Sequence, residues 1–135
     1  MLKFLLLFTY AGLLAGCGGG KAVSRQTEGA AAAGYRTVSA AEAHSMMSEL
    51  DEYVLLDVRT GDEYSAERIE GAKLIPVDEI KERAGRELPD RETAIFVYCR
   101  SGRRSADASR QLAGMGYVNV YDFGGISGWP YGTVP

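Results

Sequence analysis

The chain has 135 residues, of which 46% are hydrophobic and 24% are charged, and its formal net charge is -3. This length and composition are typical of one globular domain and exclude a disordered or collagen-like chain. The acidic balance argues against nucleic-acid binding, and one histidine with two cysteines is too few for a clustered zinc site. We therefore expect no metal and no other cofactor.

The first segment, residues 1–16, has the order of parts found in a secretory signal peptide. Lys3 supplies a positive charge, residues 4–14 are mainly apolar, and small residues precede Cys17. The apolar run has about half the length of a membrane-spanning helix. The last four residues before and including Cys17 read Leu-Ala-Gly-Cys and resemble a bacterial lipobox, which implies cleavage before Cys17 and fatty acylation of that residue.

The sequence after the cysteine predicts a tethered domain. Residues 17–34 comprise the lipidated Cys17 and a Gly- and Ala-rich stretch that we interpret as a flexible tether. The folded domain is expected over residues 35–135. We therefore expect a lipoprotein anchored to a membrane of the cell envelope, facing the periplasm or the cell exterior.

The first half of the domain alternates short apolar runs with signals for helix starts. In chain order we predict a strand at 35–38, a helix at 39–50, a strand at 53–56, a helix at 60–67, a strand at 73–75 and a helix at 78–84. Two capping boxes, which begin at Ser39 and Thr60, mark the first two helices. The second strand is continuously apolar up to Asp57, as a buried parallel strand is.

The second half continues the alternation. We predict a strand at 93–98, a loop at 99–104, a helix at 105–115 with Gly116 as its cap, a strand at 118–121 and a short turn or helix at 126–129. The whole pattern predicts an α/β fold with a doubly wound, largely parallel five-stranded sheet flanked by helices. In such sheets, sites form beyond the carboxyl ends of the strands, and Cys99 directly follows the strongest strand signal.

The loop after this strand carries the candidate chemistry. Its residues are Cys99, Arg100, Ser101, Gly102, Arg103 and Arg104, followed by Ser105. A strand–loop–helix turn presents backbone N–H groups that favour an anion, and with nearby guanidiniums they are expected to lower the pKa of a thiol below about 8.5. The pattern indicates a nucleophilic Cys99 beside a cradle for an anionic substrate. The alternative is a buried structural cysteine with solvated arginines.

This loop resembles the active loop of rhodanese-like domains, in which Cys-x4-Arg is followed by Ser or Thr, as at Cys99, Arg104 and Ser105. Four other stretches match the family's landmarks in order and spacing. They are Asp57-Val58-Arg59, Glu63-Tyr64, Ile69-Glu70-Gly71-Ala72-Lys73-Leu74-Ile75-Pro76 and Gly124-Gly125-Ile126-Ser127-Gly128-Trp129. Arg68 departs from the pattern, because the family often has histidine there. The resemblance covers nearly all of residues 35–135.

The resemblance implies a sulfurtransferase. Cys99 would take the outer sulfur of thiosulfate or a similar donor, release sulfite and pass the sulfur to cyanide or a thiol. Arg100 and Arg103 would attract the anionic donor, and Arg104 would close and orient the loop. Asp57 and Arg59 would support the loop through buried polar bonds, and Arg59 could also reach the pocket mouth. The expected partners are therefore small molecules and, through the lipid anchor, a membrane; we expect a monomer.

Three other conspicuous residues are assigned structural roles. Glu63 is interpreted as a helix-capping residue rather than an acid catalyst, and Trp129 as a packing residue. His44 lies on the first predicted helix, far from the cysteine loop in sequence, and is expected on the surface.

Two other functions remain open at this point. A phosphatase or arsenate reductase also uses an Arg-rich cysteine loop for a tetrahedral oxyanion, but relatives of that kind carry one residue more between Cys and Arg and need a general acid. A non-catalytic, membrane-tethered binding module is the other alternative, and an altered or missing loop cysteine would favour it.

Overall fold

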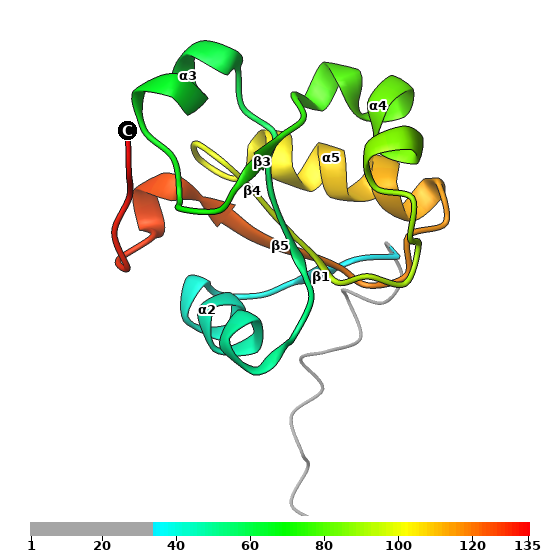
Figure 1. Cartoon of the computed structure of the whole chain (residues 1–135), viewed down its shortest axis with the longest axis horizontal. Helices are drawn as coiled ribbons and strands as arrows, with labels where there is room; N and C mark the ends of the chain where they lie inside the picture. Colours follow the sequence, from blue (N-terminus) through cyan, green and yellow to red (C-terminus); the bar gives the residue numbers. More distant parts are fainter. Residues whose placement is uncertain (1–33) are drawn as a thin grey trace, which may run out of the picture.

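The computed structural model describes residues 34–135 of the chain (Figure 1). Its strands are β1 (Arg36–Thr37), β2 (Val54–Asp57), β3 (Lys73–Leu74), β4 (Ile95–Cys99) and β5 (Val120–Gly125). They form one sheet in the order β1-β5-β4-β2-β3, in which every neighbouring pair is parallel. The predicted α/β fold with a parallel five-stranded sheet is confirmed, and β4 is its central strand.

The helices lie on both faces of this sheet. They are α2 (Ala40–Glu49), α3 (Gly61–Ala66), α4 (Ile80–Glu87) and α5 (Arg103–Gly114), with short 3-10 turns η1 (Val77–Glu79) and η2 (Ile126–Gly128). Figure 1 shows α2 on one side of the sheet and α4 with α5 on the other. Both predicted capping boxes are present, because Ser39 and Thr60 each exchange hydrogen bonds with the glutamate three residues later.

Several predicted boundaries differ from the structure. Strand β4 covers Ile95–Cys99 rather than 93–98, so Cys99 belongs to the strand and not to the loop. Helix α4 runs to Glu87, three residues beyond the prediction, and α5 begins at Arg103 rather than at residue 105. The last strand covers Val120–Gly125 instead of 118–121, because the Val118 N–H donates to the carbonyl oxygen of Arg91 and its side chain is exposed. Apolarity alone therefore placed this strand two residues too early.

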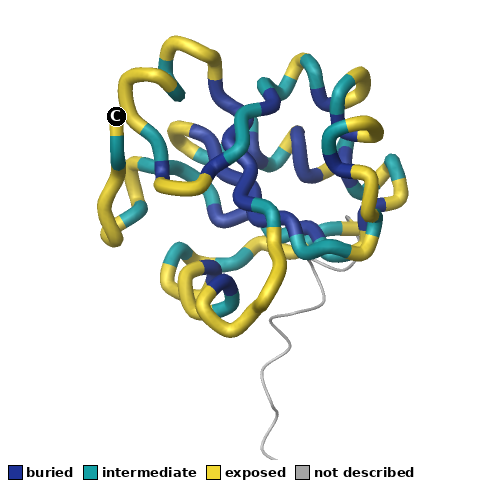
Figure 2. The backbone as a smooth tube through the Cα atoms, in the orientation of Figure 1, coloured by how far each residue is buried: buried dark blue, intermediate teal, exposed yellow. Residues whose placement is uncertain are grey.

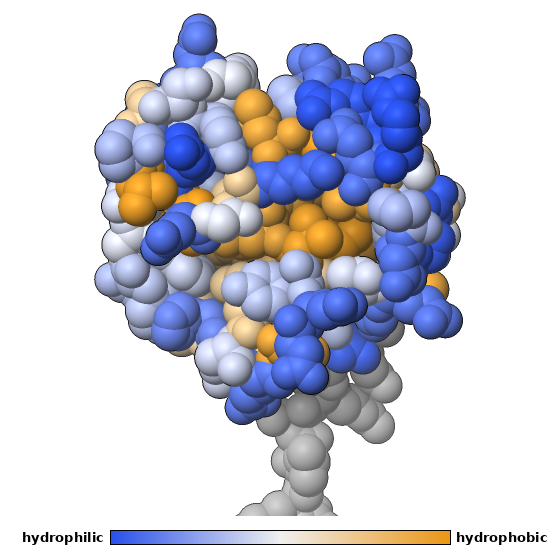
Figure 3. Space-filling model, in the orientation of Figure 1, coloured by the Kyte–Doolittle hydropathy of each residue, from blue (hydrophilic) through white to orange (hydrophobic). Residues whose placement is uncertain are grey.

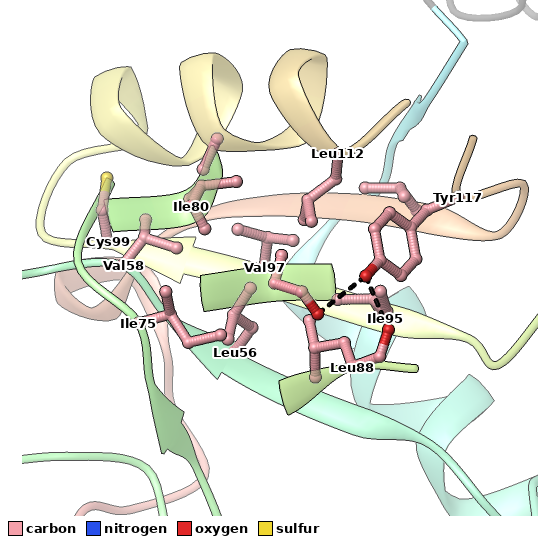
Figure 4. Close-up of a cluster of buried hydrophobic side chains, with 13 residues drawn as sticks. Leu56, Val58, Ile75, Ile80, Leu88, Ile95, Val97, Cys99, Leu112 and Tyr117 are labelled. Carbon is pink, nitrogen blue, oxygen red and sulfur yellow. Dashed lines mark hydrogen bonds between the residues drawn. The ribbon is translucent and has the colours of Figure 1, made fainter. Parts of the chain in front are cut away.

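The alternation of β4 side chains divides the core into two parts. Ile95, Val97 and Cys99 face the α4–α5 side, whereas Phe96 and Tyr98 face α2. Figure 4 shows the first cluster, with the Cys99 sulfur at its end near the start of α5. In Figure 2 the strands in the middle are the most buried part of the chain. The central strand thus carries Cys99 to the boundary between the core and the first turn of α5.

Figure 3 shows an apolar band between hydrophilic areas in the middle of this face of the molecule. No helix within residues 34–135 is both long and apolar enough to span a membrane. The expected signal peptide at residues 1–16 and the expected lipidated Cys17 lie outside the described residues.

Candidate active site

Cys99 is the last residue of β4 and lies at the carboxyl edge of the sheet. Its side chain is 1% exposed, and no disulfide involves it in the described part of the chain. It pairs in register with Gly125 of β5, just after an irregularity in the β4–β5 pairing. The sheet therefore fixes the cysteine at the position where α/β proteins form their sites.

The Cys99 sulfur lies at the N-terminus of α5. The N–H of Gly102 donates a hydrogen bond to Sγ over 3.0 Å. Gly102 is the residue before the helix and has a φ of 104°, which residues with a side chain rarely adopt. Gly102 has no side chain that could cap α5, and its own N–H, one of the helix-terminal donors without an intrahelical acceptor, donates to the sulfur.

These contacts set the ionisation of the thiol. Burial raises the pKa of Cys99. The N–H groups of Ser105, Gly102 and Ser101 and the Ser105 hydroxyl together lower it by more than burial raises it, so the pKa lies below its ordinary value. The Ser105 hydroxyl is also 3.0 Å from the carbonyl oxygen of Gly102. The amides and this hydroxyl dominate the effect, so the expected guanidinium contribution is secondary. The arrangement favours a thiolate nucleophile.

The three arginines after Cys99 have different surroundings: one forms an ion pair, and the other two line separate surface pockets. Arg104 lies in the first turn of α5 and forms a two-pronged ion pair with Glu63 of α3, at 2.8 and 3.1 Å. Arg103 is exposed and lines a depression on the outer surface of α5 with Arg110. Arg100 is exposed and lines a separate pocket that also includes Arg59 and Glu63. Arg59 thus lines the same pocket as Arg100, and the Arg104–Glu63 pair connects α5 to α3.

The Arg104–Glu63 pair makes stability depend on pH. The Arg104 guanidinium, together with hydrogen bonds from Thr60, outweighs burial and lowers the pKa of Glu63 from 4.5 to about 2, which leaves the carboxylate ionised at neutral pH. A carboxyl whose pKa is lower in the folded state stabilises the fold above pH 4.5, and this stabilisation is lost as the pH falls towards 2.

We expect Glu63→Gln to reduce the free energy of unfolding by about 1 kcal/mol at pH 7, because the bidentate pair is half-buried. Urea unfolding at several pH values should show this difference shrinking below pH 4.5. Glu70→Gln is the control, since Glu70 is exposed and has no ion pair within residues 34–135. A difference that stays constant down to pH 3 would contradict the assignment.

Asp57 and Arg59 form a buried ion pair behind the cysteine. The Arg59 Nη2 lies 2.6 Å from Asp57 Oδ2, and the Arg59 Nε and backbone N–H also donate to this carboxylate. Burial alone would lower the pKa of Arg59, but the bonds to Asp57 raise it above its ordinary value. The side chains are 4% and 0% exposed, so the pair is almost fully removed from water.

This pair acts on the strand rather than on the loop. The hydroxyl of Tyr98 donates to Asp57 Oδ2 over 2.8 Å and accepts from the N–H of Ile69, and Arg59 also donates to the carbonyl oxygen of Glu67. The expected direct support of residues 100–105 is therefore not what the structure shows. The network instead fixes Tyr98, the residue immediately before Cys99, against the segment that follows α3.

Sequence reasoning missed the roles of Tyr98, Gly125 and Ser127. The hydroxyl of Ser127 donates to the carbonyl oxygen of Arg100 over 3.1 Å. A Cβ at Gly125 would overlap that same carbonyl group and lie 2.9 Å from the Ser101 Cα. Both residues belong to the stretch that matched the terminal landmark of the family, but that match assigned them no role. The pairing of β4 with β5 brings both residues to the cysteine loop.

Two of the residues expected to be structural, His44 and Trp129, pack near α2. His44 is exposed, and its ring stacks on Tyr131 with a centroid distance of 3.8 Å. Trp129 packs against the α2-side core next to Phe123, at 5.3 Å between ring centroids. The backbone of Arg68, the departure from the family pattern, pairs with Val134 near the end of the chain. Within residues 34–135 no group of His, Cys, Asp and Glu side chains is placed to hold a metal ion.

Comparison with known protein families and curated proteins gives consistent results. The family model described as the Rhodanese-like domain matches residues 39–130. The thiosulfate sulfurtransferase PspE of Escherichia coli (strain K12) is 41% identical over 71 residues, which cover 53% of this chain and 68% of PspE. The thiosulfate sulfurtransferase GlpE of Coxiella burnetii is 31% identical over 96 residues, which cover 70% of this chain and 87% of GlpE.

Solved structures show the same similarity. A rhodanese from E. coli, solved with anions, has 36% sequence identity and a TM-score of 0.58 over 62% of this chain and 98% of its own. A rhodanese-related protein from Thermoplasma volcanium has 31% identity and a TM-score of 0.64 over 74% of this chain and 98% of its own.

Proposed function

The chain belongs to the rhodanese-like domain family and is a rhodanese-type sulfurtransferase, and from this premise we propose that Cys99 carries the transferred sulfur as a persulfide. One observation carries the proposal. The Cys99 sulfur lies at the N-terminus of α5, 3.0 Å from the Gly102 nitrogen that donates to it, and its pKa is lowered. A sulfur held in this way is a nucleophile before the donor arrives. After the transfer, the same N–H groups can stabilise the persulfide anion.

The proposed reaction has two steps. In the first, the Cys99 thiolate attacks the outer sulfur of thiosulfate, a new S–S bond forms, and the S–S bond of the donor breaks so that its electron pair leaves with sulfite. In the second, cyanide or a thiolate attacks the outer sulfur of the persulfide, and the electron pair of the breaking S–S bond returns to Cys99. The products are thiocyanate or a new persulfide, and the order of events is ping-pong.

The loop is suited to both steps. The same N–H groups that stabilise the thiolate can donate to the negatively charged outer sulfur of the persulfide, as helix N-termini donate to other anions. Arg100 lies next to Cys99 in sequence and lines the adjacent pocket, so its charge attracts an anionic donor. This combination supports thiosulfate or a similar anion as the donor.

The alternative functions are less compatible with the site. In a phosphatase or arsenate reductase, the loop arginine must bind the oxyanion, whereas Arg104 is engaged with Glu63. Glu63 is ionised at neutral pH, since its pKa is about 2, and it cannot protonate a leaving alcohol. A non-catalytic binding module would not require a thiol with a lowered pKa at a helix N-terminus.

Intact-protein mass spectrometry tests the proposed chemistry. Thiosulfate treatment should increase the mass by one sulfur atom, and peptide analysis should place that atom on Cys99. Cyanide should then restore the original mass and release thiocyanate in equal amount. A protein that hydrolyses aryl phosphates but takes up no sulfur from thiosulfate would contradict the proposal.

We also propose that the mature chain begins at an acylated Cys17 and is anchored to a membrane of the cell envelope. The proposal is supported by the signal-like order of residues 1–16 and by the acidic net charge, since an acidic protein gains little from anionic lipid and needs a covalent anchor.

In a bacterium that processes lipoproteins, the wild-type chain should incorporate labelled fatty acid and fractionate with membranes. Cys17→Ser should remove both properties, because serine cannot form the thioether to the lipid. Cys99→Ser is the matched control and should remain in the membrane fraction. A Cys17→Ser protein that still fractionates with membranes would contradict the anchor.

A further inference from the structure

One side of the cysteine loop packs against residues 125–127. Ser127 lies in η2, and its hydroxyl donates to the carbonyl oxygen of Arg100 over 3.1 Å. Gly125 lies directly opposite Cys99 in the β4–β5 register. A Cβ at Gly125 would overlap the Arg100 carbonyl oxygen and lie 2.8 Å from the carbonyl carbon. The peptide group between Arg100 and Ser101 is therefore packed against Gly125 and hydrogen-bonded to Ser127.

The geometry of a peptide group relates this contact to the sulfur. All peptide bonds in residues 34–135 are trans, so the C=O of Arg100 and the N–H of Ser101 point in opposite directions. A carbonyl that points towards Gly125 and Ser127 leaves the N–H pointing to the other side of the loop. That N–H is one of the donors that lower the pKa of Cys99.

We propose that Ser127 and Gly125 are positioning residues for sulfur transfer, which hold the Arg100 carbonyl outward and thereby direct the Ser101 N–H towards Cys99. Gly125 supplies the space for the carbonyl, and Ser127 supplies its hydrogen bond. Neither residue is among the groups that donate to the Cys99 sulfur. The effect on turnover rests on the proposed function, whereas the effect on the thiol does not.

The opposite orientation of this peptide would be unfavourable for the chemistry. If the Arg100 carbonyl turned inward, its partial negative charge would face the thiolate, and one N–H donor would be lost from the cradle. A neutral hydrogen bond such as that from Ser127 is small in net free energy, so its loss should change the balance of orientations about three- to tenfold. The expected consequence is a weaker acid at Cys99, not an unfolded protein.

The test uses Ser127→Ala in the full chain. The rate of iodoacetamide alkylation is measured as a function of pH on the peptide that contains Cys99, so that Cys17 does not contribute. We expect the pKa of Cys99 to rise by about 0.5–1 unit and kcat/KM for thiosulfate at pH 7 to fall about three- to tenfold. Ser127→Thr keeps the hydroxyl and should restore both values towards those of the wild type.

Ser48→Ala is the matched control, because Ser48 is also exposed and also donates to a backbone carbonyl, that of Ser45 in α2. It should leave the pKa of Cys99 unchanged. Gly125→Ala should raise this pKa more than Ser127→Ala, since the added Cβ displaces the loop, and its thermal unfolding shows whether it folds. If Gly125→Ala does not fold, the two Ser127 variants decide.

An unchanged Cys99 pKa in Ser127→Ala, or an equal shift in Ser48→Ala, would overturn the inference. Failure of the inference and failure of the proposed function are distinguishable, because alkylation requires no sulfur donor. A protein whose Cys99 responds to Ser127 as expected but takes up no sulfur would leave the positioning role in place and refute the persulfide chemistry.

Discussion

Cys99→Ser should abolish sulfur transfer, with thiocyanate production from thiosulfate and cyanide falling at least ~10³-fold to the uncatalysed background. A serine hydroxyl cannot form a persulfide, and at neutral pH it is not ionised. The replacement is nearly isosteric, and a hydroxyl oxygen can still accept the Gly102 N–H, so the fold should be retained. The measurement is thiocyanate release combined with intact mass.

Cys17→Ser is the matched control for this experiment. It removes the other cysteine of the chain but leaves the loop unchanged, so its catalytic rate should equal that of the wild type in detergent. If Cys99→Ser produced thiocyanate at the wild-type rate, Cys99 would not be the sulfur carrier. If both variants were inactive, transfer would involve both cysteines and the single-cysteine mechanism would be wrong.

The second large effect is expected at Asp57. Asp57→Ala leaves the Arg59 guanidinium buried without its carboxylate and removes the acceptor of the Tyr98 hydroxyl. Breaking a buried ion pair by removing one partner costs about 3–5 kcal/mol, because the remaining charge stays out of water. We therefore expect the free energy of unfolding, measured in urea, to fall by about this amount.

Asp107→Ala provides the comparison, since Asp107 pairs with Arg110 at 3.5 Å on the surface of α5, with both side chains more than half exposed. Its loss should change the free energy of unfolding by less than about 0.5 kcal/mol. Similar small effects for Asp57→Ala and Asp107→Ala would show that the Asp57–Arg59 pair does not stabilise the fold. Folded Asp57→Ala protein should also have a slower turnover, because Tyr98 and Cys99 are adjacent in β4.

Local sequence signals were enough to predict the sheet and the position of the cysteine. The capping boxes at Ser39 and Thr60 depend on contacts within four residues, and the alternating apolar runs reflect burial of each strand. These signals place Cys99 at the end of a buried strand before any tertiary contact is known. They also placed the start of α5 two residues late, because the arginines at its first turn were interpreted as part of the loop.

The contacts around the site could not be predicted in this way. Arg104 and Glu63 are 41 residues apart, as are Tyr98 and Asp57, and both contacts depend on how the elements pack. The same is true of Ser127 and Arg100, which are brought together by the pairing of β4 with β5. The sequence predicted that backbone amides and nearby guanidiniums together lower the pKa of the thiol, and in the structure the amides and the Ser105 hydroxyl have the larger effect.

The missing side-chain cap of α5 has a thermodynamic consequence. Because the N-terminal Gly102 N–H donates to the Cys99 sulfur, proton release from the thiol and folding of this region are linked. A thiol whose pKa is lower in the folded state than in the unfolded state stabilises the fold most at a pH above the unfolded value. That stabilisation is lost as the pH falls through the folded value. The sulfur atom proposed to carry the transferred sulfur therefore also contributes to the stability of the domain, and this contribution changes with its protonation.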